Sequence, residues 1–210
     1  MTPDLPEPPH RRHGGGLPRW LEWTTAIAAL VVSVSSIFIA IRNGDIENRM
    51  LKANSLPYLF IGVSDVTPEG ADQISIDLVN NGVGPANEKS LKVKVGDRYV
   101  TSVEDLIRTA VGPADAAEAV KVLKNYHNRV PTRFVAAKSD QFVFRIAKTP
   151  ENARYWEMLD RSAASNWVLE YCYCSVFDEC WKVRTEGRNA REDRQPVKAC
   201  TRDEPHEFIP

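Results

Sequence analysis

The chain has 210 residues, with 27 lysines and arginines against 28 aspartates and glutamates, so its net charge is close to zero. This balance excludes the broad basic surface that binding to DNA or RNA requires, and we expect no nucleic-acid partner. The stretch from Leu56 to Arg184, about 130 residues long, is sufficient for one compact domain.

The N-terminal part is dominated by one apolar stretch. Residues 1–19 are rich in proline and glycine, and we expect a disordered tail there. Residues 20–42 follow, with no charged side chain between Trp23 and Ile41. At about 1.5 Å per helical residue this length crosses the roughly 30 Å of bilayer hydrocarbon. The sequence therefore predicts a single transmembrane helix, followed by a juxtamembrane helix or linker at residues 43–55.

A cleaved signal peptide and a buried core helix are the alternatives to a membrane span. Ser33, Val34 and Ser35 form a small-residue cleavage candidate. The apolar run nevertheless continues from Ile37 to Ile41, which is longer than the apolar region of a secretory signal usually is. We therefore expect a retained span with the lipid bilayer as its partner.

Small residues recur along one side of this segment. They fall at spacings of four, four, three and four residues, which places them on one helix face and allows a neighbouring helix to approach closely. The sequence therefore predicts a homo-oligomer formed through this face. The residues of the face are Thr25, Ala29, Ser33, Ser36 and Ala40.

Orientation in the membrane is not decided by the basic residues, because three precede the span and three follow it within the distance over which such charges act. The cysteines favour one orientation. All four lie in the C-terminal part, and an even number in a small domain fits an oxidising compartment. We expect the N-terminus inside the cytoplasm and the domain outside it.

The domain, which we place at residues 56–185, shows the alternation of β-strands. Strands are expected at Tyr58–Val66, Gln73–Val79, Leu91–Val95 and Gln141–Ile146, with a hairpin formed by Asn166–Ser175 and Cys180–Arg184. In the first strand, apolar residues occupy both the odd and the even positions, which predicts burial on both faces. In the fourth, Phe142, Phe144 and Ile146 are expected to share one face.

Helical patterns interrupt these strands. A helical insert is expected at about residues 102–128, with Ser102 as a helix cap, and a further helix is expected to run from Thr149 toward Ala164. Residues 186–210 are charged and nearly free of aliphatic side chains, which predicts a flexible C-terminal tail. The patterns together predict a mainly β fold, a β-sandwich with helical insertions preceded by one transmembrane helix.

Two segments carry a resemblance to known proteins. The strand and turn ISIDLVNNGVGPANE resembles a segment of bacterial Ig-like or fibronectin-like modules of the cell-adhesion-related type. The hairpin EYCYCSVFDECW is similar to the terminal hairpin of uncharacterised bacterial single-pass membrane proteins. The long, largely helical insertion between Thr101 and Asp140 departs from a plain Ig-like sandwich. The resemblance implies an Ig-like β-sandwich at the bacterial inner membrane, with a periplasmic domain for recognition or assembly, and supplies no catalytic residues.

The four cysteines form the most distinctive cluster of side chains. Alternation places Cys172 and Cys174 on the strand face opposite Tyr171, which predicts that they point outward. Cys174 is then able to pair with Cys180 across the hairpin turn, which leaves Cys172 for Cys200. Free thiols and a four-thiolate zinc site are the alternatives, although the spacing lacks the paired C-x2-C motifs of zinc sites.

No other motif predicts chemistry. His127 is the only histidine inside the domain and has no accompanying nucleophile. We therefore expect no enzyme and no catalytic, cofactor or metal site. The leading hypothesis is a membrane-anchored module that binds or assembles with another protein. The alternatives are a thiol-active redox protein or sensor that uses Cys172 and Cys174, and an oligomeric effector that permeabilises membranes.

Overall fold

The computed structural model describes residues 18–123, 127–128, 134–188 and 192–210. The chain divides into two compact units, with the boundary along the chain between Met50 and Leu51. Each unit is described by itself. The expected N-terminal tail lies almost entirely outside the described residues, and so does the side chain of His127.

The first unit consists of helix α1, which spans Arg19–Asn54 and so also supplies the first residues of the second unit. Its 36 residues correspond to about 54 Å of helix. By the criteria of length and apolar composition, this helix is able to cross a membrane. The hydroxyls of Ser33 and Ser36 donate to the carbonyls of Ala29 and Val32, both at 2.8 Å. These polar groups are therefore satisfied within the helix, as a hydrocarbon environment requires.

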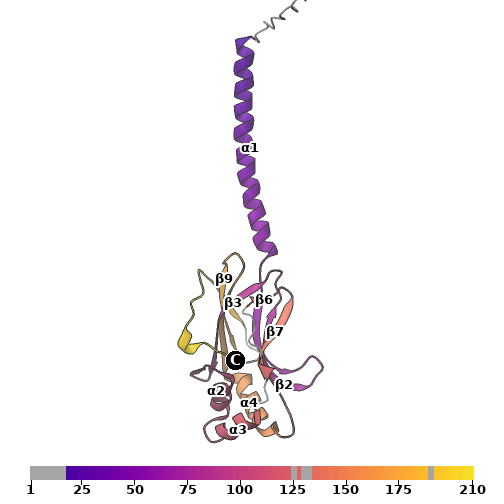
Figure 1. The fold of residues 1–210 in the computed structure, drawn as a ribbon, viewed down its shortest axis with the longest axis vertical. Coiled ribbons are helices and arrows are strands. Elements are labelled where there is room, and N and C mark those ends of the chain that lie inside the picture. The colour runs from indigo at the N-terminus through magenta and orange to yellow at the C-terminus, as the bar shows by residue number, and fades with distance from the viewer. Residues whose placement is uncertain (1–17, 124–126, 129–133, 189–191) are drawn as a thin grey trace, which may run out of the picture. The chain divides into compact units, whose positions relative to one another are not determined.

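The second unit contains two antiparallel sheets (Figure 1). The four-stranded sheet has the order β1-β2-β7-β5. Its strands are β1 (Leu59–Val66), β2 (Asp72–Asn80), β7 (Ser139–Ala147) and β5 (His127–Asn128). The six-stranded sheet has the order β10-β9-β8-β3-β4, with β6 paired to the start of β3. Its strands are β3 (Ala86–Val95), β4 (Arg98–Val100), β6 (Phe134–Val135), β8 (Trp167–Cys174), β9 (Cys180–Glu186) and β10 (Asp193–Val197).

Strand β1 corrects the expectation of a strand buried on both sides. Leu59, Ile61 and Val63 face the core, but Phe60 is 37% exposed. The reason is that the core covers only the inner face of the four-stranded sheet, to which β1 belongs. The apolar residues of its other parity therefore face outward.

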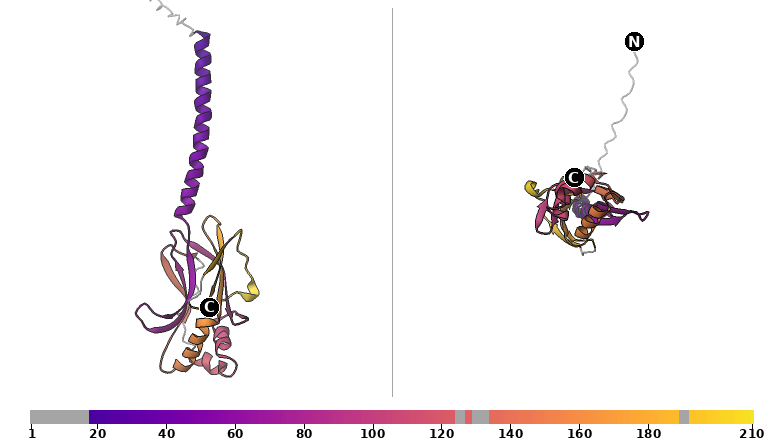
Figure 2. Two further views of the ribbon diagram at one scale, coloured as in Figure 1. Left: turned by 180° about the vertical axis from the view of Figure 1, so that it is seen from behind. Right: turned by 90° about the horizontal axis from the view of Figure 1, so that it is seen from below.

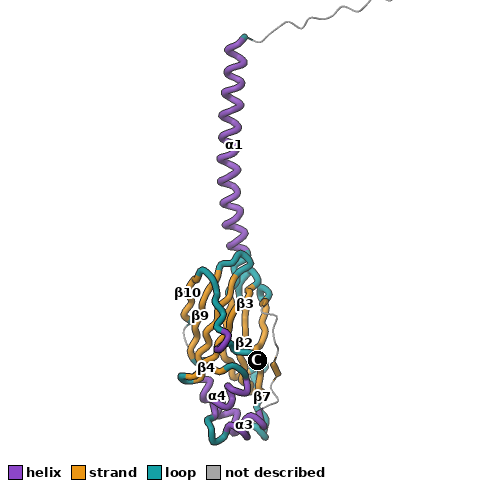
Figure 3. The backbone as a smooth tube through the Cα atoms, turned by 60° about the vertical axis from the view of Figure 1, so that its left-hand side comes forward, coloured by secondary structure: helices purple, strands orange, loops and turns teal. Residues whose placement is uncertain are grey.

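Three helices of the described domain gather at one end of the sheets (Figures 1 and 3). They are α2 (Val103–Val111), α3 (Ala116–Leu123) and α4 (Ala153–Ser165). The cap predicted for the first of them is confirmed, because the Ser102 hydroxyl accepts from the Asp105 amide at 3.1 Å. The indole of Trp156 in α4 donates to the Ile146 carbonyl of β7 at 3.1 Å, which fastens this helix to the four-stranded sheet.

The two sheets face each other across a common core (Figure 2). Phe144 of β7 and Trp167 of β8 meet there with ring centroids 6.3 Å apart. The antiparallel sheets that the alternation predicts are therefore present. The mainly β class is not confirmed, since about 38% of the described residues are helical and 34% are in strands, and α1 supplies much of the helix.

The flexible tail expected at residues 186–210 is the main error among the predictions. Strand β10 pairs with β9, and a short 3-10 helix follows at Glu204–His206. Phe208 is only 3% exposed, and its amide donates to the Leu91 carbonyl at 2.8 Å. Composition misled the prediction because the segment is held by a few anchoring residues and backbone hydrogen bonds rather than by an apolar stripe.

Candidate functional site

Two disulfides join strand β8 to β9 and to the C-terminal segment, which we define as residues 198–210. Cys174 bonds Cys180 with sulfurs 2.06 Å apart, and Cys172 bonds Cys200 with sulfurs 2.04 Å apart. Cys174 and Cys180 stand directly opposite each other in the β8–β9 register. The first pair is the one that the hairpin pattern predicts, and the second is the pairing that it leaves for the other two cysteines.

The cysteines of β8 point to the outer side of the sheet, as alternation predicts, but they are not exposed. Cys172 is 6% and Cys174 3% accessible. The C-terminal segment explains this, because Ala199 and Thr201 line the same small hollow as Cys172 on the outer face of the sheet. Lys92 of β3 helps to hold the segment there through an ion pair with Asp203 at 2.7 Å.

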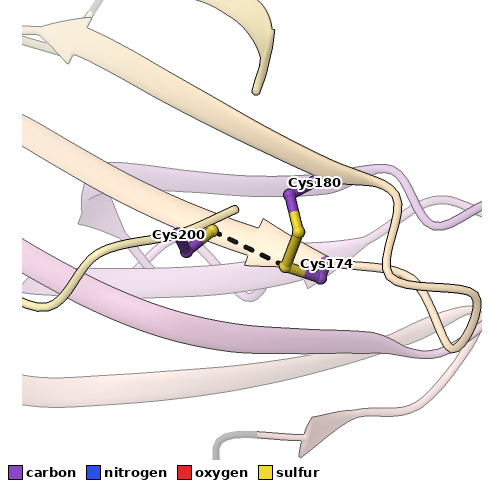
Figure 4. A group of neighbouring side chains, drawn as sticks. All are labelled: Cys174, Cys180 and Cys200. Carbon is purple, nitrogen blue, oxygen red and sulfur yellow. Dashed lines mark hydrogen bonds between the residues drawn. A yellow bond between two sulfur atoms is a disulfide. The ribbon is translucent and has the colours of Figure 1, made fainter. Parts of the chain in front are cut away.

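The two disulfides touch each other. The sulfurs of Cys174 and Cys200 lie 3.6 Å apart, although they belong to different bonds (Figure 4). Because both atoms are in disulfides, neither carries a proton, and the approach is a nonbonded contact rather than a hydrogen bond. The sulfurs of Cys174, Cys180 and Cys200 all lie within 4.8 Å of one another.

The oxidised pairs do not fit the other interpretations of the cysteines. All four lie among the described residues, and none of them is free. Zinc binds cysteine as the thiolate, so a sulfur already engaged in a disulfide is not a ligand. In this state the protein also presents no thiol pair at Cys172 and Cys174 for redox chemistry.

A second cluster closes the sheets along the edge of β1. The hydroxyl of Tyr171, on the inner face of β8, donates to the Leu59 carbonyl and accepts from the Ile61 amide, both at 3.2 Å. Burial raises the pKa of Tyr171, so its hydroxyl keeps the proton that it donates. One side chain of the six-stranded sheet thus satisfies two backbone groups of the other sheet.

Arg194 of β10 reinforces the same edge. It donates to the Leu59 carbonyl at 2.9 Å, to Glu192 at 2.6 Å and to the hydroxyl of Tyr173. Its guanidinium carbon also lies 3.9 Å from the centroid of the Tyr58 ring, which is within cation–π range. Nothing in the sequence pattern marks Arg194, because it lies in the segment whose composition predicts a tail.

A groove of about 380 Å³ crosses the outer face of the four-stranded sheet. Gly62 also lines it, and the Phe60 ring lies over this glycine, since a β-carbon there would be 2.5 Å from Cε1 of Phe60. Phe60 and Val66 line the groove and are 37% and 49% exposed. The missing side chain at Gly62 therefore makes room for the Phe60 ring, and Phe60 and Val66 are the exposed apolar side chains of the groove.

The other side of the groove is polar. Arg145 of β7 lies 3.4 Å from a carboxylate oxygen of Asp77, and its guanidinium carbon lies 4.1 Å from the centroid of the Phe142 ring. Phe142 was expected on the core face with Phe144, but a register irregularity opposite Ile76 and Asp77 turns the two apart. The bulge is the physical reason, because one extra residue reverses the alternation that precedes it.

Comparison with known proteins adds no family to these observations. No protein-family model matches the chain, and searches of curated proteins and of solved structures give no match. The resemblance to bacterial Ig-like modules therefore stays a prediction. So does the role of the small-residue face on α1.

The bridge made by Tyr171 gives a prediction about stability. Tyr171→Phe keeps the ring but leaves the Ile61 amide without its acceptor, whereas the Leu59 carbonyl keeps Arg194. We expect the free energy of unfolding to fall by about 1–3 kcal/mol, the cost of an unsatisfied buried polar group. Denaturant unfolding of the full chain in detergent measures it. Tyr155→Phe, at a partly buried position on α4, is the matched control and should change stability by less than about 0.5 kcal/mol; equal effects of the two substitutions would refute the bridge.

Proposed function

We propose that the protein is a single-pass membrane-anchored module whose Ig-like domain binds or assembles with another protein. The groove on the outer face of the four-stranded sheet is the observation that carries this proposal. An outer sheet face is normally polar, yet Phe60 and Val66 are substantially exposed on it. Apolar residues concentrated on such a face are typical of a protein interaction surface.

The composition of the groove suits a polypeptide partner. Exposed aromatic and arginine side chains are enriched at protein interfaces, and Phe60 and Arg145 both line this groove. A volume of about 380 Å³ lies at the lower end of the range for small-ligand pockets, which suits one or two side chains better than a large cofactor.

The disulfides support a location outside the cytoplasm. Disulfides persist in oxidising compartments and are rare in the cytosol, and this domain has two of them. With α1 as the anchor, we place the domain in the bacterial periplasm, at the inner membrane. The N-terminal tail then lies in the cytoplasm.

The partner-binding proposal is tested by site-specific photo-crosslinking in native membranes. With a photoreactive residue at Val66 of the full chain, we expect a discrete adduct with one protein. Phe60→Ser should reduce this adduct at least several-fold, because it removes the aromatic wall of the groove. Phe177→Ser is the matched control, since Phe177 is similarly exposed, at 42%, in the β8–β9 turn. An adduct that responds equally to both substitutions, or no adduct above that of a photoreactive residue at Lys182, would contradict the proposal.

The proposed orientation is tested by reporter fusions after Glu186. An alkaline phosphatase fused there should be active, because this enzyme matures only outside the cytoplasm, and a green fluorescent protein should be dark. Fusions at the N-terminus are the control and should not show this phosphatase activity. The reverse pattern would place the domain in the cytoplasm, where the two disulfides would not be expected to persist.

Self-association through the small-residue face of α1 completes the proposed function. Ala29 and Ser33 lie one helical turn apart on this face, and the Ser33 hydroxyl is satisfied by its own helix. Replacing both with leucine should weaken crosslinked dimers in membranes, because the larger side chains separate the helix backbones. Leucine at Val31 and Val34, off this face, is the control. Unchanged dimers in the Ala29 and Ser33 variant would exclude the face.

A further inference from the structure

The contact between the two disulfides brings sulfurs from three separate segments together. Cys174 comes from β8, Cys180 from the start of β9, and Cys200 from the C-terminal segment. The Cys174 and Cys200 sulfurs are 3.6 Å apart without being bonded. We propose that these residues form a thiol–disulfide exchange site, at which Cys200 changes its partner from Cys172 to Cys174. This proposal does not depend on the groove or on its partner.

The reaction needs an external thiol, either a small thiol compound or a dithiol protein. Its thiolate attacks the Cys180 sulfur, forms a mixed disulfide with Cys180 and displaces Cys174 as a thiolate. Cys174 then attacks Cys200, forms the Cys174–Cys200 bond and displaces Cys172, which takes a proton from water. The reaction starts with two disulfides and one thiol and ends with two disulfides and one thiol, so nothing is oxidised or reduced overall.

Loop lengths favour this order of events. The Cys174–Cys180 bond joins residues only six apart in sequence, so by chain-entropy reasoning it stabilises the fold less than the Cys172–Cys200 bond, which joins residues 28 apart. Opening the shorter loop first is therefore the less costly step. Cys174 and Cys200 are 26 residues apart, almost the same as 28, so chain entropy does not separate the two pairings of Cys200. Both pairings should be populated.

Exchange would move the attachment of the C-terminal segment by two residues along β8, which is about 7 Å in a strand. The segment covers a hollow of about 160 Å³ that Ser90, Lys92 and Lys182 also line. Ser90 is only 5% exposed, whereas Lys182 is exposed, so the hollow is covered in part. The expected consequence is that the cover over these side chains shifts toward the hairpin turn.

The experiment begins with Cys180→Ser in the full chain, purified without reductant. This variant has a free Cys174 thiol beside the Cys172–Cys200 bond, so exchange needs no external thiol. Free thiols are alkylated after an acid quench, and the protein is digested with chymotrypsin, which cleaves after Tyr173 and so separates Cys172 from Cys174. We expect both Cys172–Cys200 and Cys174–Cys200 peptides, within about tenfold of each other, with label on Cys174 and Cys172 respectively. Label on Cys174 alone would overturn the proposal.

Two further measurements guard against misfolding and random scrambling. Cys200→Ser leaves Cys172 unpaired next to an intact Cys174–Cys180 bond, and we expect label on Cys172 alone; label on Cys180 would mean unspecific exchange and would count against the site. In the unmodified protein, a limiting phosphine reductant should produce label on Cys180 and Cys172 with a Cys174–Cys200 peptide. Label confined to Cys174 and Cys180 would overturn the proposal even if Cys180→Ser failed to fold.

Discussion

The hydroxyl of Tyr171 is the polar contact on which the closure of the two sheets depends. It bonds the Leu59 carbonyl and the Ile61 amide of β1, which belong to the other sheet. Apolar contacts between sheets tolerate small shifts, but a buried hydroxyl that serves two backbone groups fixes one alignment. Arg194 adds a second donor to the same carbonyl from β10, so two strands, β8 and β10, are positioned around one backbone segment of β1.

This constraint also fixes the position of the cysteines. Tyr171 and Tyr173 face the core, and Cys172 and Cys174 occupy the alternate positions of the same strand. A slip of β8 by one residue would exchange the two sets, because side chains in a strand alternate with a period of two. The register that places Tyr171 against β1 is therefore the register that presents Cys174 to Cys180 across the hairpin.

Alternation and capping rules predicted the features that depend on neighbouring residues. The hairpin, its cysteine partners and the Ser102 cap are of this kind, since each depends on a few positions close in sequence. The failures have other causes. The bulge that separates Phe142 from Phe144 depends on pairing with a distant strand, and the exposure of Phe60 depends on which face of the sheet the core covers. The docking of the C-terminal segment depends on single anchors such as Phe208, which composition does not reveal, although the pairing of Cys200 with Cys172 was expected.

The groove and the exchange site occupy the outer faces of different sheets, and the core lies between them. β1 carries Phe60 of the groove, and Tyr171 of β8 holds this strand in place. Exchange at Cys174 acts on the opposite face of β8 and moves the C-terminal segment, while the inward side chains of β8 keep their contacts. The two Cys200 pairings should therefore present the same groove, so a partner bound there would not distinguish them. Binding and exchange are in this sense separate properties of one domain, fixed by the two faces of a single strand.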